Sequence, residues 1–149
     1  MTDASLPAVA ISAQTPDWSR ERKSTWRWAP SRSLLASVRA YQRHAASRSP
    51  LAALGRMAAV LRHRWWSIVT GADIPLNCRL GGGLLLPHPN GIVIHPQAEV
   101  GPNCLIFQQV TLGVGGRPGT PRIGANAVVL DDVPSGATAV GIPARVVAP

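Results

Sequence analysis

From Gly71 onward, aliphatic residues recur at every sixth position of the chain. Two series separated by a two-residue shift are followed by a third, shorter series: Ile74, Leu80, Leu86 and Ile92; Ile94, Val100, Ile106 and Leu112; Ile123 and Val129. A second residue, usually small, stands four places after most of these positions: Cys78, Leu84, Asn90, Ala98, Cys104, Val110, Ala127 and Val133. A stretch rich in Gly and Pro, residues 113–122, interrupts the register before the third series.

A period of six matches neither the 3.6 residues of an α-helix nor the two of a simple strand. It is typical of a parallel β-helix, in which three short strands form one triangular coil and the aliphatic residue points into the prism. The residue four places later lies near a corner, where a small side chain fits. At about 18 residues per coil, residues 71–149 provide between three and four coils, and at least three are needed for stability. We therefore predict a mainly β fold over this range.

Upstream of Gly71 the pattern predicts helices. Apolar residues recur at steps of three or four and form one stripe, from which Arg56, Arg62 and Arg64 are excluded: Leu51, Leu54, Ala58, Leu61, Trp65 and Ile68. Ser49 is placed as N-cap, Pro50 as first residue and Gly71 as C-cap of this helix. A shorter helix is expected from Leu34 to about Ala46. We predict a helical region over 33–70 and a disordered basic tail over 1–32, where Ser, Thr, Pro and Arg are mixed without a period.

The net charge of +8 belongs to the N-terminal part, because eleven of the 15 Lys and Arg residues lie between Arg20 and Arg64. Such a block is able to contact nucleic acid, an anionic membrane or an acidic partner, but a solvated helical face is the favoured interpretation. Cys78 and Cys104 lack the spacing of a zinc site and are expected to be buried. The sequence has no apolar run of membrane-spanning length and no secretory signal at its start, so we expect a cytoplasmic protein.

Three blocks in the repeat region are specific. His88 precedes Gly91-Ile92-Val93-Ile94, Gln109-Val110-Thr111-Leu112-Gly113 follows, and Val140-Gly141-Ile142-Pro143-Ala144-Arg145 closes the set. Together they resemble serine acetyltransferases, which are hexapeptide-repeat acyltransferases, and related acetyltransferases of polysaccharide pathways. The resemblance implies a left-handed β-helix, a homotrimer or dimer of trimers, acetyl-CoA as co-substrate without a metal, and a role in cysteine biosynthesis. It also implies coenzyme contacts at Gly113 and Ala125.

The resemblance assigns His88 as the general base, and Asp73, fifteen positions upstream, as the carboxylate that orients it. A neutral imidazole with a pKa near 6.5 accepts a proton at neutral pH, and a hydroxyl is a poor nucleophile until such a base is within reach. A neighbouring carboxylate fixes the tautomer and stabilises the imidazolium. Fifteen residues are nearly one coil, so both side chains are expected on one edge in adjacent coils. His95 is expected at a corner, and His44 and His63 on the surface.

Several positions depart from the family pattern. Pro87 replaces an aspartate that commonly precedes the histidine, and Gly119 and Thr120 replace an Arg-His pair of the acceptor site. About four hexads that usually follow Pro121 are missing. Three functions therefore stay open: O-acetylation of L-serine, O-acetylation of a sugar hydroxyl, and a scaffold without catalysis. The glycines 81–83 are expected at tight corners, with a close approach of the adenosine diphosphate end of CoA as a second use.

Overall fold

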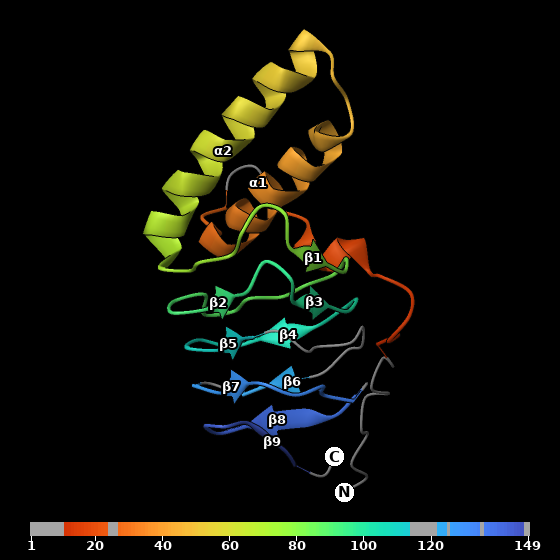
Figure 1. Cartoon of the computed structure of the whole chain (residues 1–149), viewed down its shortest axis with the longest axis vertical. Coiled ribbons are helices and arrows are strands. Elements are labelled where there is room, and N and C mark those ends of the chain that lie inside the picture. Colours follow the sequence, from red (N-terminus) through yellow and green to blue (C-terminus); the bar gives the residue numbers. More distant parts are fainter. Residues whose placement is uncertain (1–10, 24–26, 114–121, 125, 135, 148–149) are drawn as a thin grey trace, which may run out of the picture.

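The computed structural model describes residues 11–23, 27–113, 122–124, 126–134 and 136–147. A helical hairpin stands at one end of a stack of short strands (Figure 1). The helices are the 3-10 helix η1 (Trp18–Glu21), α1 (Pro30–Ala45) and α2 (Pro50–Thr70). The strands are β1 (Arg79–Leu80), β2 (Val93–Ile94), β3 (Glu99–Val100), β4 (Leu105–Ile106), β5 (Thr111–Leu112), β6 (Arg122–Ile123), β7 (Val128–Val129), β8 (Thr138–Val140) and β9 (Arg145–Val147).

The ends of α2 are the predicted ones. The Ser49 hydroxyl accepts a hydrogen bond from the Ala52 N–H at 3.2 Å, and Pro50 follows as the first helical residue. Gly71 ends the helix in the left-handed conformation, with φ of 64°, and its N–H donates to the Ser67 carbonyl at 2.8 Å. The first long helix, α1, begins at Pro30, ahead of the predicted Leu34, because Pro30 is suited to an N-terminal helical position.

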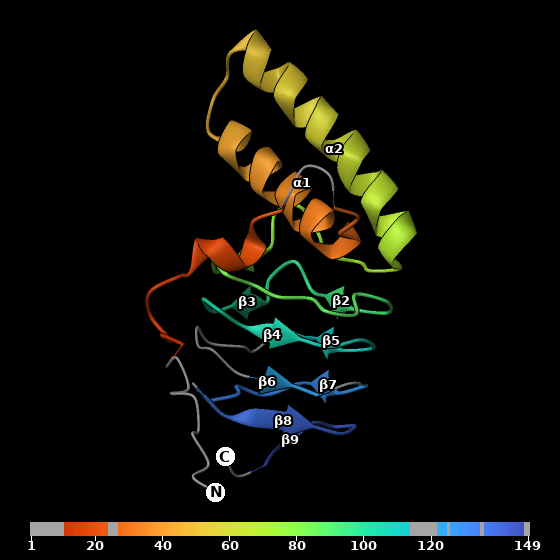
Figure 2. The same cartoon turned by 180° about the vertical axis from the view of Figure 1, so that it is seen from behind.

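The strands form three sheets in which segments far apart in sequence pair in parallel. One sheet has the order β2-β5-β7, a second begins β4-β6-β8, and a third contains β1 and β3. In the first sheet Val93 pairs with Thr111 and Thr111 with Val128, so the chain returns to the same face at intervals close to eighteen residues. Bridges from Asp73 to Val93 and from Leu85 to Leu105 extend the same pairing. The views from both sides show these strands as stacked levels (Figures 1 and 2).

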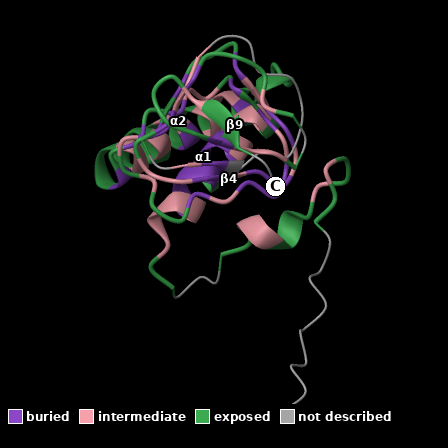
Figure 3. Cartoon of the chain, turned by 90° about the horizontal axis from the view of Figure 1, so that it is seen from below, coloured by how far each residue is buried: buried purple, intermediate pink, exposed green. Residues whose placement is uncertain are grey.

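The predicted inward positions make up the core. All ten sixth-position residues except Leu112 are buried, and so are most residues four places later. Figure 3 shows buried segments, in purple, within the body of the molecule. Leu112 and Val133 are partly buried and pack against this core. Asn90 is the exception: it is exposed, since the chain turns there and its side chain accepts a hydrogen bond from the Gln109 amide at 3.1 Å. Asn90 thus forms a polar corner just before the two-residue shift between Ile92 and Ile94.

The last strand departs from the parallel arrangement. β9 pairs antiparallel with β8, Val140 facing Arg145, and the connecting turn contains the closing Gly-Ile-Pro-Ala block with a cis Ile142–Pro143 peptide bond. Two strands joined by so short a turn must run antiparallel, because a parallel return needs a crossover of a dozen residues or more. The final element is therefore a hairpin.

Part of the stretch predicted to be disordered is ordered against the stack. Asn103 occupies a corner with φ of 60°, and its side chain accepts from the Asp17 N–H at 2.7 Å and donates to the Ser12 and Thr15 carbonyls. The Glu21 carboxylate accepts from the Leu84 N–H at 3.1 Å. These contacts between distant residues have no periodic signal in the sequence, so the pattern did not predict them.

Arg39 joins α1 to the first level of the stack. Its guanidinium donates to the carbonyls of Leu80 and Gly81 at 2.6 and 2.7 Å and pairs with Glu21 at 2.9 Å. The Trp18 ring lies 5.1 Å from the same guanidinium. None of the described helices is both long and apolar enough to cross a bilayer.

Candidate active site

The candidate site surrounds one corner of the stack, where residues with left-handed backbone conformation lie above one another. Gly71, Gly91, Gln109 and Asn126 all have φ between 58 and 69°. The Gly91 N–H donates to the Gly71 carbonyl at 2.8 Å, and the Gln109 N–H donates to the Asn90 carbonyl at 3.0 Å. A Cβ on Gly91 would lie 2.4 Å from the end of the Gln109 side chain, so a larger residue would require that side chain to move, and the φ of 69° also favours glycine there.

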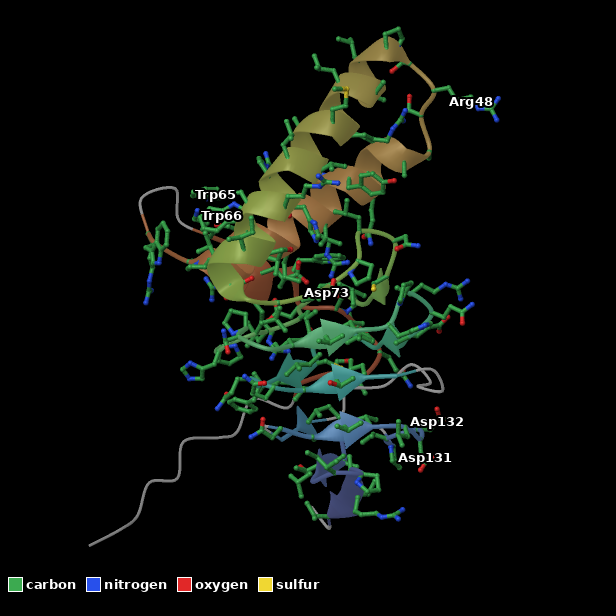
Figure 4. All side chains as sticks on the ribbon, turned by 60° about the vertical axis from the view of Figure 1, so that its left-hand side comes forward. Arg48, Trp65, Trp66, Asp73, Asp131 and Asp132 are labelled. Atoms are coloured by element: carbon green, nitrogen blue, oxygen red, sulfur yellow. The ribbon has the colours of Figure 1, made fainter. Side chains whose placement is uncertain are left out.

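Asp73 stands two residues after this corner on the first level. Its backbone bridges to Val93: its N–H donates to the Ile92 carbonyl at 2.8 Å, and its carbonyl accepts from the Ile94 N–H at 2.9 Å. The side chain is exposed and lies where α2 passes into the stack (Figure 4). This position follows from the Gly71 cap, which reverses the chain out of α2 and into the first coil.

His88 stands three residues before Gly91, the corner residue on the next level. The turn that carries it follows the buried Leu86 and ends with the Ile92 N–H donating to the Pro89 carbonyl at 3.2 Å. Its imidazole is exposed, as is the preceding Pro87. Both residues are described by the structure, and their side chains are not hydrogen-bonded to each other. The two residues flank one corner from its two sides, in adjacent levels.

The structure describes one of the two residues that were expected to contact the coenzyme. Gly113 directly follows β5, and its N–H donates to the Val129 carbonyl at 3.1 Å. It adjoins an apolar hollow lined by Ile106, Leu112, Ile123, Val129 and Val133 among others. Ala125, together with Gly119 and Thr120, lies outside the described residues.

The glycines 81–83 have packing partners within the chain. A Cβ on Gly81 would lie 2.4 Å from the Pro102 nitrogen, and one on Gly82 would lie 2.6 Å from the Trp18 ring. Gly83 has φ of 78° and faces the Asn103 side chain. The expected tight packing at these glycines is therefore confirmed, and its partners are η1 and the next level of the stack.

The other histidines serve the fold. His95 is exposed at a corner, as predicted, and its Nδ1 accepts from the Gln97 N–H at 3.2 Å. His63 was expected on the surface but is half-buried, with Nε2 2.8 Å from the Ile74 carbonyl oxygen, so it links α2 to the first coil. His44 is also half-buried, because Gly55 lets α2 pack against its ring. Within the described ranges, no three His, Cys, Asp or Glu side chains gather as a set of metal ligands.

Both cysteines are buried, as predicted. Burial, with a contribution from the Asp73 charge, raises the pKa of the Cys78 thiol to about 11. Burial also raises the pKa of Cys104 to about 12, although a backbone hydrogen bond from Gly101 opposes the shift. Since the thiolate is the reactive form, neither cysteine is suited to be a nucleophile at neutral pH.

Comparisons with known proteins support the same family as the motifs. No protein-family profile matches the chain. The serine acetyltransferase of Synechococcus elongatus is 38% identical over 107 residues, covering 54% of this chain and 44% of that protein. A serine acetyltransferase solved in complex with CoA has a TM-score of 0.56 at 26% identity, covering 80% of this chain and 58% of that one. The Neisseria gonorrhoeae enzyme solved in complex with serine has a TM-score of 0.52 at 26% identity, covering 78% and 54%.

The resemblance to serine acetyltransferases is thereby confirmed, and the chain spans about half the length of the curated relatives it matches. An alignment of 107 residues that covers only 54% of a 149-residue chain includes positions that the relative has and this chain lacks. This agrees with the hexads found missing from the sequence.

Proposed function

We propose that this chain is an acetyl-CoA-dependent O-acetyltransferase of the serine acetyltransferase kind, which converts L-serine and acetyl-CoA to O-acetyl-L-serine and CoA. One observation carries the proposal: His88 and Asp73 flank the same corner in adjacent levels of a stack whose relatives are serine acetyltransferases. Relatives solved with CoA and with serine support both substrates. The proposal includes a left-handed winding of the stack and a cytoplasmic enzyme of cysteine biosynthesis.

The chemistry requires one base and one site for the developing negative charge. As the acceptor hydroxyl oxygen attacks the thioester carbonyl, His88 takes the hydroxyl proton, and the carbonyl oxygen becomes an oxyanion. Backbone N–H groups at the corner would stabilise this oxyanion. When the tetrahedral intermediate collapses, the C–S bond breaks and the His88 imidazolium returns the proton to the CoA sulfur. Asp73 would stabilise the imidazolium and hold the ring in the required tautomer.

The exposure of His88 in a single chain supports a shared site. A base that is open to water on one side needs a further wall to exclude solvent and position the acceptor. We propose that a neighbouring copy in a homotrimer supplies this wall, and that any pairing of trimers uses other surfaces of the chain.

The test measures release of free CoA from acetyl-CoA with L-serine, for the wild type, His88→Ala and the control His95→Ala, which removes another exposed imidazole. We expect activity that falls at least a hundredfold in His88→Ala and changes little in His95→Ala. Asp73→Asn should reduce kcat while leaving KM for acetyl-CoA nearly unchanged. Full activity in His88→Ala would exclude this residue as the base.

A sugar hydroxyl is the second candidate acceptor, and Pro87 favours it. This exposed residue directly precedes His88 in place of a commonly found aspartate that helps to hold the amino acid, so one charged contact to serine is missing. Loss of such a contact typically costs about 1–3 kcal/mol of binding, enough to change the preferred acceptor. Faster CoA release with a sugar than with serine, still dependent on His88, would identify this function. No acetyl-CoA binding and no release with any acceptor would leave the scaffold hypothesis.

A further inference from the structure

The outer face of α2 is apolar and uncovered. Six large apolar side chains, which we call the outer stripe, are between 61 and 81% exposed: Leu51, Leu54, Met57, Leu61, Trp65 and Ile68. They recur at steps of three and four along a helix of 21 residues, about 30 Å long. Trp65 and Trp66 are adjacent in Figure 4 near the end of α2 that joins the stack. A contiguous apolar surface of this kind usually marks an interaction site.

The opposite face of α2 explains why the outer stripe does not pack against the rest of the protein. Ala52 and Ala59 are the small residues that α2 packs against α1, and Thr70 is buried at its end. His63 and Trp66 are half-buried on the same side, and Trp66 contacts the Trp28 ring at 5.6 Å between centroids. The rotation of the helix is therefore determined by these contacts, and the large apolar residues face away from the protein.

Charge identifies the chemistry of the surface that would cover this face. Between Arg22 and Ala72 the sequence has ten Lys and Arg residues and no Asp or Glu. At 100° per residue, Arg62 and Arg64 lie on the two sides of the outer stripe, and both are exposed. A helix with an apolar face bordered by arginines is typical of segments that lie in the interface of an anionic membrane.

A second copy of this hairpin is a poorer match. Each copy would bring the same arginines and no carboxylate within the hairpin to pair with them. We propose that α2 lies flat on an anionic phospholipid bilayer, with the outer stripe at the boundary of headgroups and acyl chains and with Arg62 and Arg64 at the lipid phosphates. This binding does not depend on the proposed acetyltransferase activity. The proposal differs from the solvated helical face that the sequence favoured.

The test is cosedimentation of the full chain with vesicles of phosphatidylcholine alone and of phosphatidylcholine mixed with phosphatidylglycerol. The wild type should bind the mixed vesicles more tightly, and added salt should weaken that binding. Arg62→Gln and Arg64→Gln should each weaken it about fivefold. Leu61→Asp should weaken it more than tenfold. The controls Arg145→Gln and Ile11→Asp change exposed residues outside α2 and should bind as the wild type does.

Circular dichroism and sedimentation velocity of each variant separate the alternatives. Intact helix content in Leu61→Asp together with lost vesicle binding supports the proposal. Equal loss in the Ile11→Asp control, or no preference of the wild type for the anionic vesicles, would overturn it. The proposal would also be overturned if the wild type self-associates, does not bind vesicles, and dissociates in the Leu61→Asp variant. A second copy of the chain would then cover the outer stripe.

Discussion

The helical hairpin and the strand stack use apolar residues in opposite ways. In the stack, strands of one level pair with strands of the next, and the aliphatic side chains at the sixth positions point inward; Ile94 and Ile106 are each 1% exposed. In α2 the small residues point inward, since Ala59 packs against α1 while Leu61 is 67% exposed. The spacing of apolar residues thus predicts the type of element in both regions. It predicts which face is buried only in the stack, where each level is covered by the next.

The largest expected effect comes from the interior of the stack. Ile94→Ala removes a fully buried side chain and leaves a cavity among residues from adjacent coils, so we expect a loss of about 2–5 kcal/mol in the free energy of unfolding. Urea unfolding followed by circular dichroism measures it. Val93→Ala is the control, because Val93 neighbours Ile94 on the same strand but is 41% exposed. Equal losses in the two variants would mean that the alternation of inward and outward positions is wrong.

A second prediction concerns the junction between the two regions. Arg39→Met removes the donors that reach Leu80 and Gly81 and leaves the Glu21 carboxylate, only 10% exposed, without its cation. We expect a loss of about 2–3 kcal/mol from an unpaired, largely buried charge. Adding Glu21→Gln should restore part of it, because the buried charge is then gone. The exposed pair of Arg79 and Glu99 is the comparison, and Arg79→Met should cost less than about 1 kcal/mol.

Losses in Arg39→Met and Arg79→Met that are the same in urea unfolding would contradict the joining role of Arg39. A double variant that is no more stable than Arg39→Met alone would show that the unpaired Glu21 charge does not contribute to the loss of stability. Either result would leave the two regions connected chiefly by the apolar contacts of Leu34, Leu35 and Val38 with the core of the stack.

The sequence predicted the stack well because the six-residue spacing places an aliphatic residue at the same inward position in each successive coil. Each aliphatic residue meets the same environment one coil later, so the pattern was sufficient to identify the core and the corners near His88 and His95. It did not predict the contacts of Asn103 with residues 12–17 or the link from His63 to Ile74. These are single interactions between segments far apart in sequence, and they produce no repeating pattern from which they could be predicted. The pairing of Asp73 with the corner of His88 came from the family resemblance and the length of one coil.

The smallest expected effect compares two adjacent alanines of α2, one exposed and one buried. Ala59→Leu adds three carbons to a side chain that is 1% exposed against α1, and overpacking of this kind costs about 1–3 kcal/mol. Ala58→Leu makes the same change on the exposed side and should shift the unfolding free energy by less than about 0.5 kcal/mol, since alanine and leucine are both good helix formers. Because the substitution is identical, propensity cancels and the difference reports only the environment. A destabilised Ala58→Leu whose loss depends on protein concentration would mean that another copy already covers the outer stripe.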